Sequence, residues 1–193
     1  MEEIKIQSGK YMLNSDRLFL RPVDSVDLSS VHEILSFPET NRFNTLGIPK
    51  SIDKTALILD KWISSHVKMP SRKFTFAVFD RESARLIGLF ALNAGSKKYK
   101  NAEIWYKFHV HFWNRGFAIE ALNTILEFGF ESLKLHRIEA GCAAENLRSI
   151  KMLEKAGLLR EGCRRKAIPL QSGWADCVEY GITEEDYRAQ FIR

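Results

Sequence analysis

The sequence contains few cysteines and no long apolar segment, and each absence excludes a class of protein. Three cysteines occur among 193 residues, at positions 142, 163 and 177, without the spacing of a metal site or a disulfide framework. No apolar run approaches the roughly 18–20 residues that cross a bilayer. The N-terminal segment carries Glu2, Glu3 and Lys5 where a signal peptide is apolar. We therefore expect a cytoplasmic protein with reduced thiols, no metal ion and no membrane contact.

Basic residues are in excess, giving a net charge of +5, but they are dispersed along the chain. The densest basic run comprises Arg160, Arg164, Arg165 and Lys166, and Glu161 interrupts it. A nucleic-acid-binding face combines clustered basic residues with aromatic residues, so DNA binding is not expected. A modest positive field suits a small polyanionic ligand instead.

The hydrophobic pattern predicts one domain, residues 1–193, in which strands and helices are interspersed. Strands are predicted over 17–21, 73–79, 86–93, 102–110, 136–142, 158–168 and 174–182, and helices over 27–37, 51–66, 118–133 and 146–157. Residues 38–50 are predicted to form an irregular loop. This order favours an α/β (α+β) fold with a mixed, mostly antiparallel central sheet and helices on both faces.

The segment Trp113–Ala118 joins an aromatic-rich strand to an amphipathic helix. Gly116 falls in the first turn of that helix, where a glycine is normally unfavourable. A helix N-terminus presents unpaired N–H groups and a positive dipole end, so it binds phosphate readily. A residue without a side chain lets a diphosphate approach the backbone, and Arg115 adds a cation. On these residues alone, the segment is either a phosphate-binding turn or an ordinary strand-to-helix turn.

A second strand-and-helix pair follows in the C-terminal half of the chain. The segment 136–142 alternates as a strand does, and Asn146 is placed as the N-cap of a helix. Apolar residues recur along that helix, and Gly157 is suited to end it.

Taken together, these motifs resemble the GCN5-related N-acetyltransferases (GNAT superfamily), and within them the Rim-type ribosomal-protein N-terminal acetyltransferases. Trp113–Ala121 stands in place of the family's Gln/Arg-x-x-Gly-x-Gly/Ala loop, and Asn146–Leu158 matches its later helix. Arg17–Pro22 resembles the start of the Rim-type group, and Ala102–Tyr106 resembles its central strand. The resemblance runs over nearly the whole chain and implies a single N-acetyltransferase domain.

The resemblance also implies acetyl-CoA as co-substrate, with coenzyme A bound by the central strand end, the phosphate turn and the later helix. The residues expected to contact it are Phe108, His109, Val110, Asn114, Arg115, Gly116, Phe117, Ala118, Asn146, Ser149 and Lys155. Its three phosphate groups account for the positive net charge more economically than a nucleic acid does.

Amide formation needs a neutral amine, whereas an α-amino group has a pKa of about 7.7–8.0 and a lysine about 10.4. A placed base must remove the proton, directly or through water. In Rim-type enzymes a glutamate matching Glu103 is taken as this base; the alternative for Glu103 is a solvated or arginine-paired carboxylate. Glu120, on the helix after the phosphate turn, is expected to be structural.

The leaving thiolate needs a hydrogen-bond donor. Many relatives place a tyrosine seven residues after the residue matching Asn146, but this chain has Leu153 there. Rim-type enzymes often have a serine at the position of Ser149, and a thiol pKa of about 8.5 makes the thiolate a tolerable leaving group. The alternatives are that Ser149 is a surface residue without a role, or that Tyr106 serves the sulfur.

Three functions remain open. The first is acetyl transfer, by direct transfer, to the α-amino group of a protein, and the second is transfer to a small amine such as a polyamine, amino-sugar or antibiotic. The third is a CoA-binding module without turnover. A peptide acceptor needs an open groove between the 38–50 loop and the 169–174 turn, whereas a small amine favours a closed, acidic pocket. A homodimer is one alternative for the oligomeric state.

Overall fold

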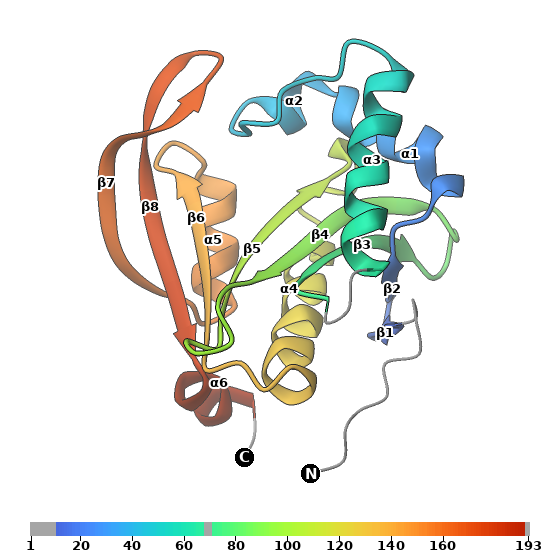
Figure 1. Ribbon diagram of the computed structural model, residues 1–193. Coiled ribbons are helices and arrows are strands. Elements are labelled where there is room, and N and C mark those ends of the chain that lie inside the picture. Colours follow the sequence, from blue (N-terminus) through green and yellow to red (C-terminus); the bar gives the residue numbers. More distant parts are fainter. Residues whose placement is uncertain (1–10, 68–70, 192–193) are drawn as a thin grey trace.

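The computed structural model describes residues 11–67 and 71–191, so the N-terminal charges Glu2, Glu3 and Lys5 lie outside the described residues. Eight strands form one sheet in the order β1-β2-β3-β4-β5-β6-β8-β7 (Figure 1). The strands are β1 (Leu13–Asn14), β2 (Leu18–Pro22), β3 (Lys73–Asp80), β4 (Leu86–Ala94), β5 (Asn101–Phe108), β6 (Arg137–Ala143), β7 (Leu159–Leu170) and β8 (Gly173–Thr183). All neighbours are antiparallel except β5 and β6, which run parallel.

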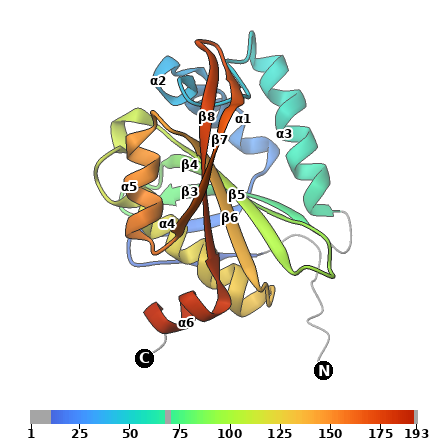
Figure 2. The ribbon, with the colours of Figure 1, turned by 90° about the vertical axis from the view of Figure 1, so that its left-hand side faces the viewer.

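Helices cover both faces of the sheet, as the sequence predicts. They are α1 (Leu28–Ser36), α2 (Pro38–Asn41), α3 (Ile52–Val67), α4 (Phe117–Glu127), α5 (Leu147–Lys155) and α6 (Glu184–Phe191). The turned view shows α1 and α3 on one side of the sheet and α4 and α5 on the other (Figure 2). None of the helices described is long and apolar enough to cross a membrane.

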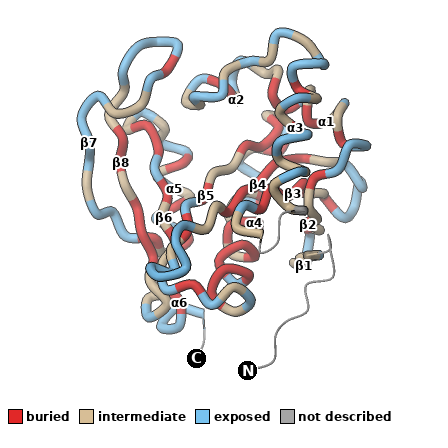
Figure 3. The backbone as a smooth tube through the Cα atoms, viewed as in Figure 1, coloured by how far each residue is buried: buried red, intermediate tan, exposed pale blue. Residues whose placement is uncertain are grey.

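Two apolar clusters hold these layers together, and the red segments of Figure 3 follow them through the sheet. The larger packs α4 against the sheet, and the smaller packs α1 and α3 against the opposite face. Fully buried members of the first include Leu122 and Ile125, and those of the second include Val31 and Leu35. Burial at about 25 cal/mol per Å² of apolar surface is the main favourable term in such packing.

Strands β5 and β6 separate partway along their length, and this gap positions the site. Their pairing runs from Asn101↔Arg137 to Glu103↔Glu139 and then stops, while β5 continues to Phe108 and β6 to Ala143. Figure 1 shows the two strands diverging beyond this point. The gap is therefore open toward the C-terminal ends of both strands.

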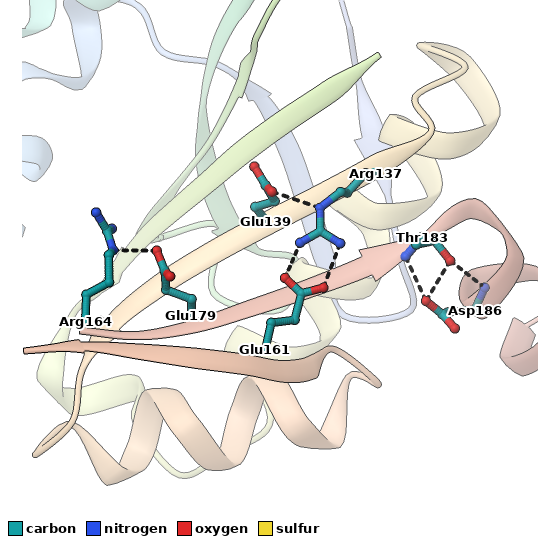
Figure 4. Close-up of polar contacts among 7 residues, drawn as sticks. All are labelled: Arg137, Glu139, Glu161, Arg164, Glu179, Thr183 and Asp186. Atoms are coloured by element: carbon teal, nitrogen blue, oxygen red, sulfur yellow. Dashed lines mark hydrogen bonds and ion pairs between the residues drawn. The ribbon is translucent and has the colours of Figure 1, made fainter. Parts of the chain in front are cut away.

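A charged cluster fixes the closed end of this gap (Figure 4). Arg137 on β6 donates to Glu139 on its own strand and, through two nitrogens, to Glu161 on β7. The planar guanidinium suits such a paired contact with a carboxylate. Nearby, Asp186 accepts hydrogen bonds from both the backbone and the hydroxyl of Thr183, which fixes the start of α6.

The structure differs from the predicted elements in several places. The segment predicted as an irregular loop, residues 38–50, begins with helix α2, because Pro38 stands at a first helical position that suits proline. The helix predicted to reach Leu133 ends as α at Glu127 and continues as a π-helical turn, Phe128–Ser132. The two-residue strand β1 and helix α6 were not predicted, because neither has enough apolar periodicity to stand out.

Candidate active site

A cavity of about 620 Å³ lies at the open end of the β5–β6 gap, between the end of β5 and α5, the helix that follows β6. Its walls come from α2 and the residues after it, from the end of β5, from the N-terminal part of α4, and from the whole length of α5. Of the residues predicted to bind coenzyme A, eight line it: Phe108, Asn114, Gly116, Phe117, Ala118, Asn146, Ser149 and Lys155. The sequence motifs, far apart in the chain, therefore meet at one cavity.

Consecutive residues of β5 line the cavity from opposite faces of the sheet. Side chains alternate along a strand, so Tyr106 faces α5 while Lys107 faces the helices on the other side. Tyr106 is hydrogen-bonded to Ser149 of α5, and Lys107 donates to Asn41 of α2 at 2.8 Å. Both line the cavity, which consequently passes through the sheet and can admit two reactants from opposite sides.

The α4 end of the cavity has the features of an anion site. Gly116 is the N-cap of α4 with φ +82°, and none of the described side chains caps that helix. This left-handed backbone favours glycine. The conformation is thus a second reason for a glycine at position 116, in addition to the approach of a diphosphate to the backbone that the sequence led us to expect. The first N–H groups of α4 remain available for a phosphate. Arg148, Lys151 and Lys155 of α5 add positive charge to the lining of the same cavity.

The start of α5 supplies the hydroxyl side of the cavity. The side-chain oxygen of Asn146 accepts from the Ser149 backbone N–H at 3.3 Å, so capping uses the amide oxygen and leaves the NH₂ group for another partner. Ser149 is buried and lines the cavity. Burial raises the pKa of Tyr106 well above its ordinary value, which keeps the phenol protonated.

Glu120 is part of a structural network beside the cavity. Its carboxylate accepts from the hydroxyl of Ser15 at 2.7 Å and from the backbone and guanidinium of Arg17. The same guanidinium donates to the carbonyl of Arg115 and lies over the Phe117 ring. These contacts tie the start of β2 to the start of α4, in agreement with the structural role predicted for Glu120.

Three residues predicted to bind coenzyme A do not line the cavity. His109 is 2 % exposed, packs edge-on against Phe37 and lies 3.2 Å from a Glu33 oxygen. The strand ends before it, so Val110 begins a 3-10 turn instead of extending the wall. The Arg115 guanidinium lies over the Phe117 ring at 5.0 Å, while its residue stays exposed at the cavity rim.

Glu103 lies outside the residues that line the cavity. It is exposed and occupies the last position at which β5 pairs with β6, opposite Glu139, where these two strands begin to separate. Among the described residues it has no ion pair or hydrogen-bond partner, so the alternative of an arginine-paired carboxylate finds no support. Its role as a base stays a prediction.

Sequence reasoning expected the 38–50 segment beside a peptide acceptor, but it missed Lys107 and did not single out the residues of the α2 wall, which comprises Glu39, Thr40, Arg42, Phe43 and Asn44. The 169–174 turn, expected as the other side of that groove, does not line the cavity. The signal was present for Lys107, because a lone cation stands in the aromatic stretch Trp105–Phe108. No comparable signal marks the α2 wall, since its residues reach the cavity only through tertiary packing. No cluster of metal-binding side chains occurs within the ranges 11–67 and 71–191.

Comparisons with known proteins identify the family of the chain. A profile of the acetyltransferase (GNAT) domain family matches residues 17–159. The uncharacterized N-acetyltransferase YnaD of Bacillus subtilis is 32 % identical over 177 residues, covering 91 % of this chain and 98 % of YnaD. A GNAT-family acetyltransferase structure from Bacillus anthracis is 30 % identical, with a TM-score of 0.79, over 91 % of this chain and 99 % of its own.

A further neighbour, the spermidine N-acetyltransferase of Vibrio cholerae in complex with CoA and spermine, shares the fold. Its TM-score is 0.79 at 23 % identity, over 90 % of this chain and 99 % of its own. The chain belongs to the GNAT acetyltransferase family and is an acyltransferase of the N-acetyltransferase type. Enzymes of this family use acetyl-CoA, and the uncapped start of α4 with its neighbouring cations fits the phosphates of that co-substrate.

Proposed function

We propose that the protein transfers the acetyl group of acetyl-CoA directly to the α-amino group of a peptide or protein, as the Rim-type resemblance implies. The charge of the acceptor side supports this choice. The α2 part of the cavity carries one carboxylate, Glu39, beside the cations Arg42 and Lys107. A polyamine carries several positive charges, and such a wall repels it.

The small-amine alternative rests on a relative. The spermidine N(1)-acetyltransferase of Vibrio cholerae matches over 90 % of this chain, whereas the uS5-alanine N-acetyltransferase of Escherichia coli matches over 59 %. Both are only about a quarter identical to this chain, at 25 % and 24 %. The charge of the residues that line this cavity is therefore stronger evidence about the acceptor than the substrate named for either relative.

The Glu103 carboxylate lies at the closed end of the gap, outside the residues that line the cavity. In the proposed mechanism it therefore takes a proton from the acceptor ammonium through a water molecule and not by direct contact. The neutral nitrogen then attacks the thioester carbonyl carbon. As the C–N bond forms, the C–S bond breaks, and the sulfur leaves as a thiolate. The Tyr106–Ser149 hydroxyl pair donates a hydrogen bond to that sulfur. The nitrogen gives up a second proton as the amide forms, and this proton reaches the thiolate through solvent to give the free thiol, while the first proton stays with Glu103 until it passes to water.

A panel of acceptors tests the proposal. Thiol release from acetyl-CoA is followed with short peptides bearing a free α-amine, with the same peptides blocked at the N-terminus but containing lysine, and with spermidine. The proposal expects release with the free peptides alone. Faster release with spermidine than with any peptide contradicts it, and binding of coenzyme A without release from any amine supports the non-catalytic alternative.

A further inference from the structure

Lys107 is a buried cation without a charged partner among the described residues. It is 4 % exposed, lies on the acceptor side of β5 and lines the cavity. Lysine is almost never fully buried unless it is paired, and burying a charge without a partner is strongly unfavourable. Burial accordingly lowers the pKa of Lys107 from 10.5 to about 8. The burial of Lys107 without a charged partner therefore indicates that a ligand in the cavity supplies the missing negative charge.

The contact with Asn41 orients the ammonium group of Lys107. The Asn41 NH₂ group donates to the backbone carbonyls of Leu35 and Phe37 at 2.7 and 2.8 Å, which turns its oxygen toward Lys107. That oxygen accepts one of the three ammonium hydrogens. The described residues offer no acceptor for the other two, although the side chain borders the cavity.

Two free donors on a buried cation match a carboxylate, which presents two acceptor oxygens and a compensating charge. We propose that Lys107, held by Asn41, binds a carboxylate of the acceptor, so that the preferred acceptor is an amine carrying a carboxylate close to its reactive nitrogen. An acidic residue near a peptide N-terminus and the α-carboxylate of a free amino acid both present this group. The inference rests on the proposed acetyl transfer at the same cavity.

Matched acceptors test it in the wild-type protein. Initial rates are compared for a peptide with aspartate at its second position and the same peptide with asparagine, and for an amino acid and its carboxamide. Hydrogen bonds to charged groups are worth about ten- to one-hundredfold, so kcat/KM should favour the carboxylate by that factor, mainly through KM. The pair with the larger ratio identifies the source of the carboxylate.

The Lys107→Met variant keeps the length of the side chain and removes its charge. The ratio between carboxylate and amide acceptors should fall to near one, while Lys107→Arg should retain part of it. Lys98→Met, at an exposed position in the β4–β5 turn, is the matched control and should keep the full ratio. If Lys107→Met loses kcat equally for every acceptor, the inference is overturned and Lys107 acts instead as a base.

The wild-type ratios do not depend on any variant folding. Acetylation of the peptides with a ratio near one refutes the carboxylate contact and leaves the acetyltransferase proposal standing. Failure of every amine to accept an acetyl group, with coenzyme A still bound in calorimetry, refutes both.

Discussion

The hydroxyl of Tyr106 on β5 is hydrogen-bonded to the hydroxyl of Ser149 on α5. This contact spans the gap where β5 has left β6, and both residues line the cavity. Leu153, where many relatives have a tyrosine, is fully buried in the core. In this chain the phenol that borders the cavity is therefore that of Tyr106 on β5, and its hydrogen bond to Ser149 links it to α5.

The hydroxyl pair predicts modest effects on turnover. One neutral hydrogen bond contributes about 0.5–1.5 kcal/mol, so Ser149→Ala should slow turnover by about two- to thirteenfold where chemistry limits the rate. Tyr106→Phe should do the same, and the double variant should lose less than the product of the two factors because they act together. Steady-state kcat measures all three. Strict multiplication of the effects would show that the two hydroxyls act independently.

Gly116 should prove important for both stability and cofactor affinity. Its φ of +82° costs a residue with a Cβ roughly 1–2 kcal/mol, and an added Cβ would lie 3.2 Å from the Arg17 guanidinium. Gly116→Ala should lower the free energy of unfolding and weaken coenzyme A binding, measured by urea titration and calorimetry. A valine at Gly116 should disturb the fold for the same reason.

Gly47→Ala provides the control for that substitution. Gly47 has a similar φ of +73°, and an added Cβ there meets nothing within 4 Å. The variant should lose comparable stability but bind coenzyme A as the wild type does. If both variants bind coenzyme A equally, the start of α4 is not the phosphate site.

Glu103 should affect turnover without affecting cofactor binding. If its carboxylate removes the amine proton through water, Glu103→Gln lowers kcat by about two to four orders of magnitude at pH 7. The loss shrinks as pH rises, because more of the acceptor is already neutral. Glu139, the neighbour across the strands, gives a matched control in Glu139→Gln. Near-normal turnover of Glu103→Gln at pH 7 would leave this residue as a surface carboxylate.

His66 should make the protein less stable in mild acid. Its Nε2 accepts from the Thr75 backbone N–H at 2.7 Å, and burial lowers its pKa from 6.5 to about 4. Between these values the unfolded chain binds the proton and the folded chain does not. The stability that neutral His66 contributes is therefore complete above pH 6.5 and is lost as pH falls toward 4, by about 3 kcal/mol in total. The difference in free energy of unfolding between pH 7 and pH 4.5, measured by urea titration, should be smaller for His66→Gln than for the wild type.

The local signals of the sequence predicted the residues at the starts of α4 and α5 that line the cavity, and packing decided the rest. Gly116 and Asn146 mark helix starts by their own backbone preferences, so they were found without a structure. His109 was misplaced because its role depends on Phe37 and Glu33, which come from a distant helix and the turn after it. The partnership of Lys107 with Asn41 was invisible for the same reason, since it joins residues 66 positions apart.

The most direct test of the account is to locate the transferred acetyl group by mass spectrometry. A peptide with a free α-amine and one internal lysine is incubated with isotope-labelled acetyl-CoA and the wild-type protein, then fragmented. The account predicts the label on the α-nitrogen, and none when Glu103→Gln is used for the same short time at pH 7. Label on the lysine side chain, or transfer to spermidine with none to the peptide, would contradict it.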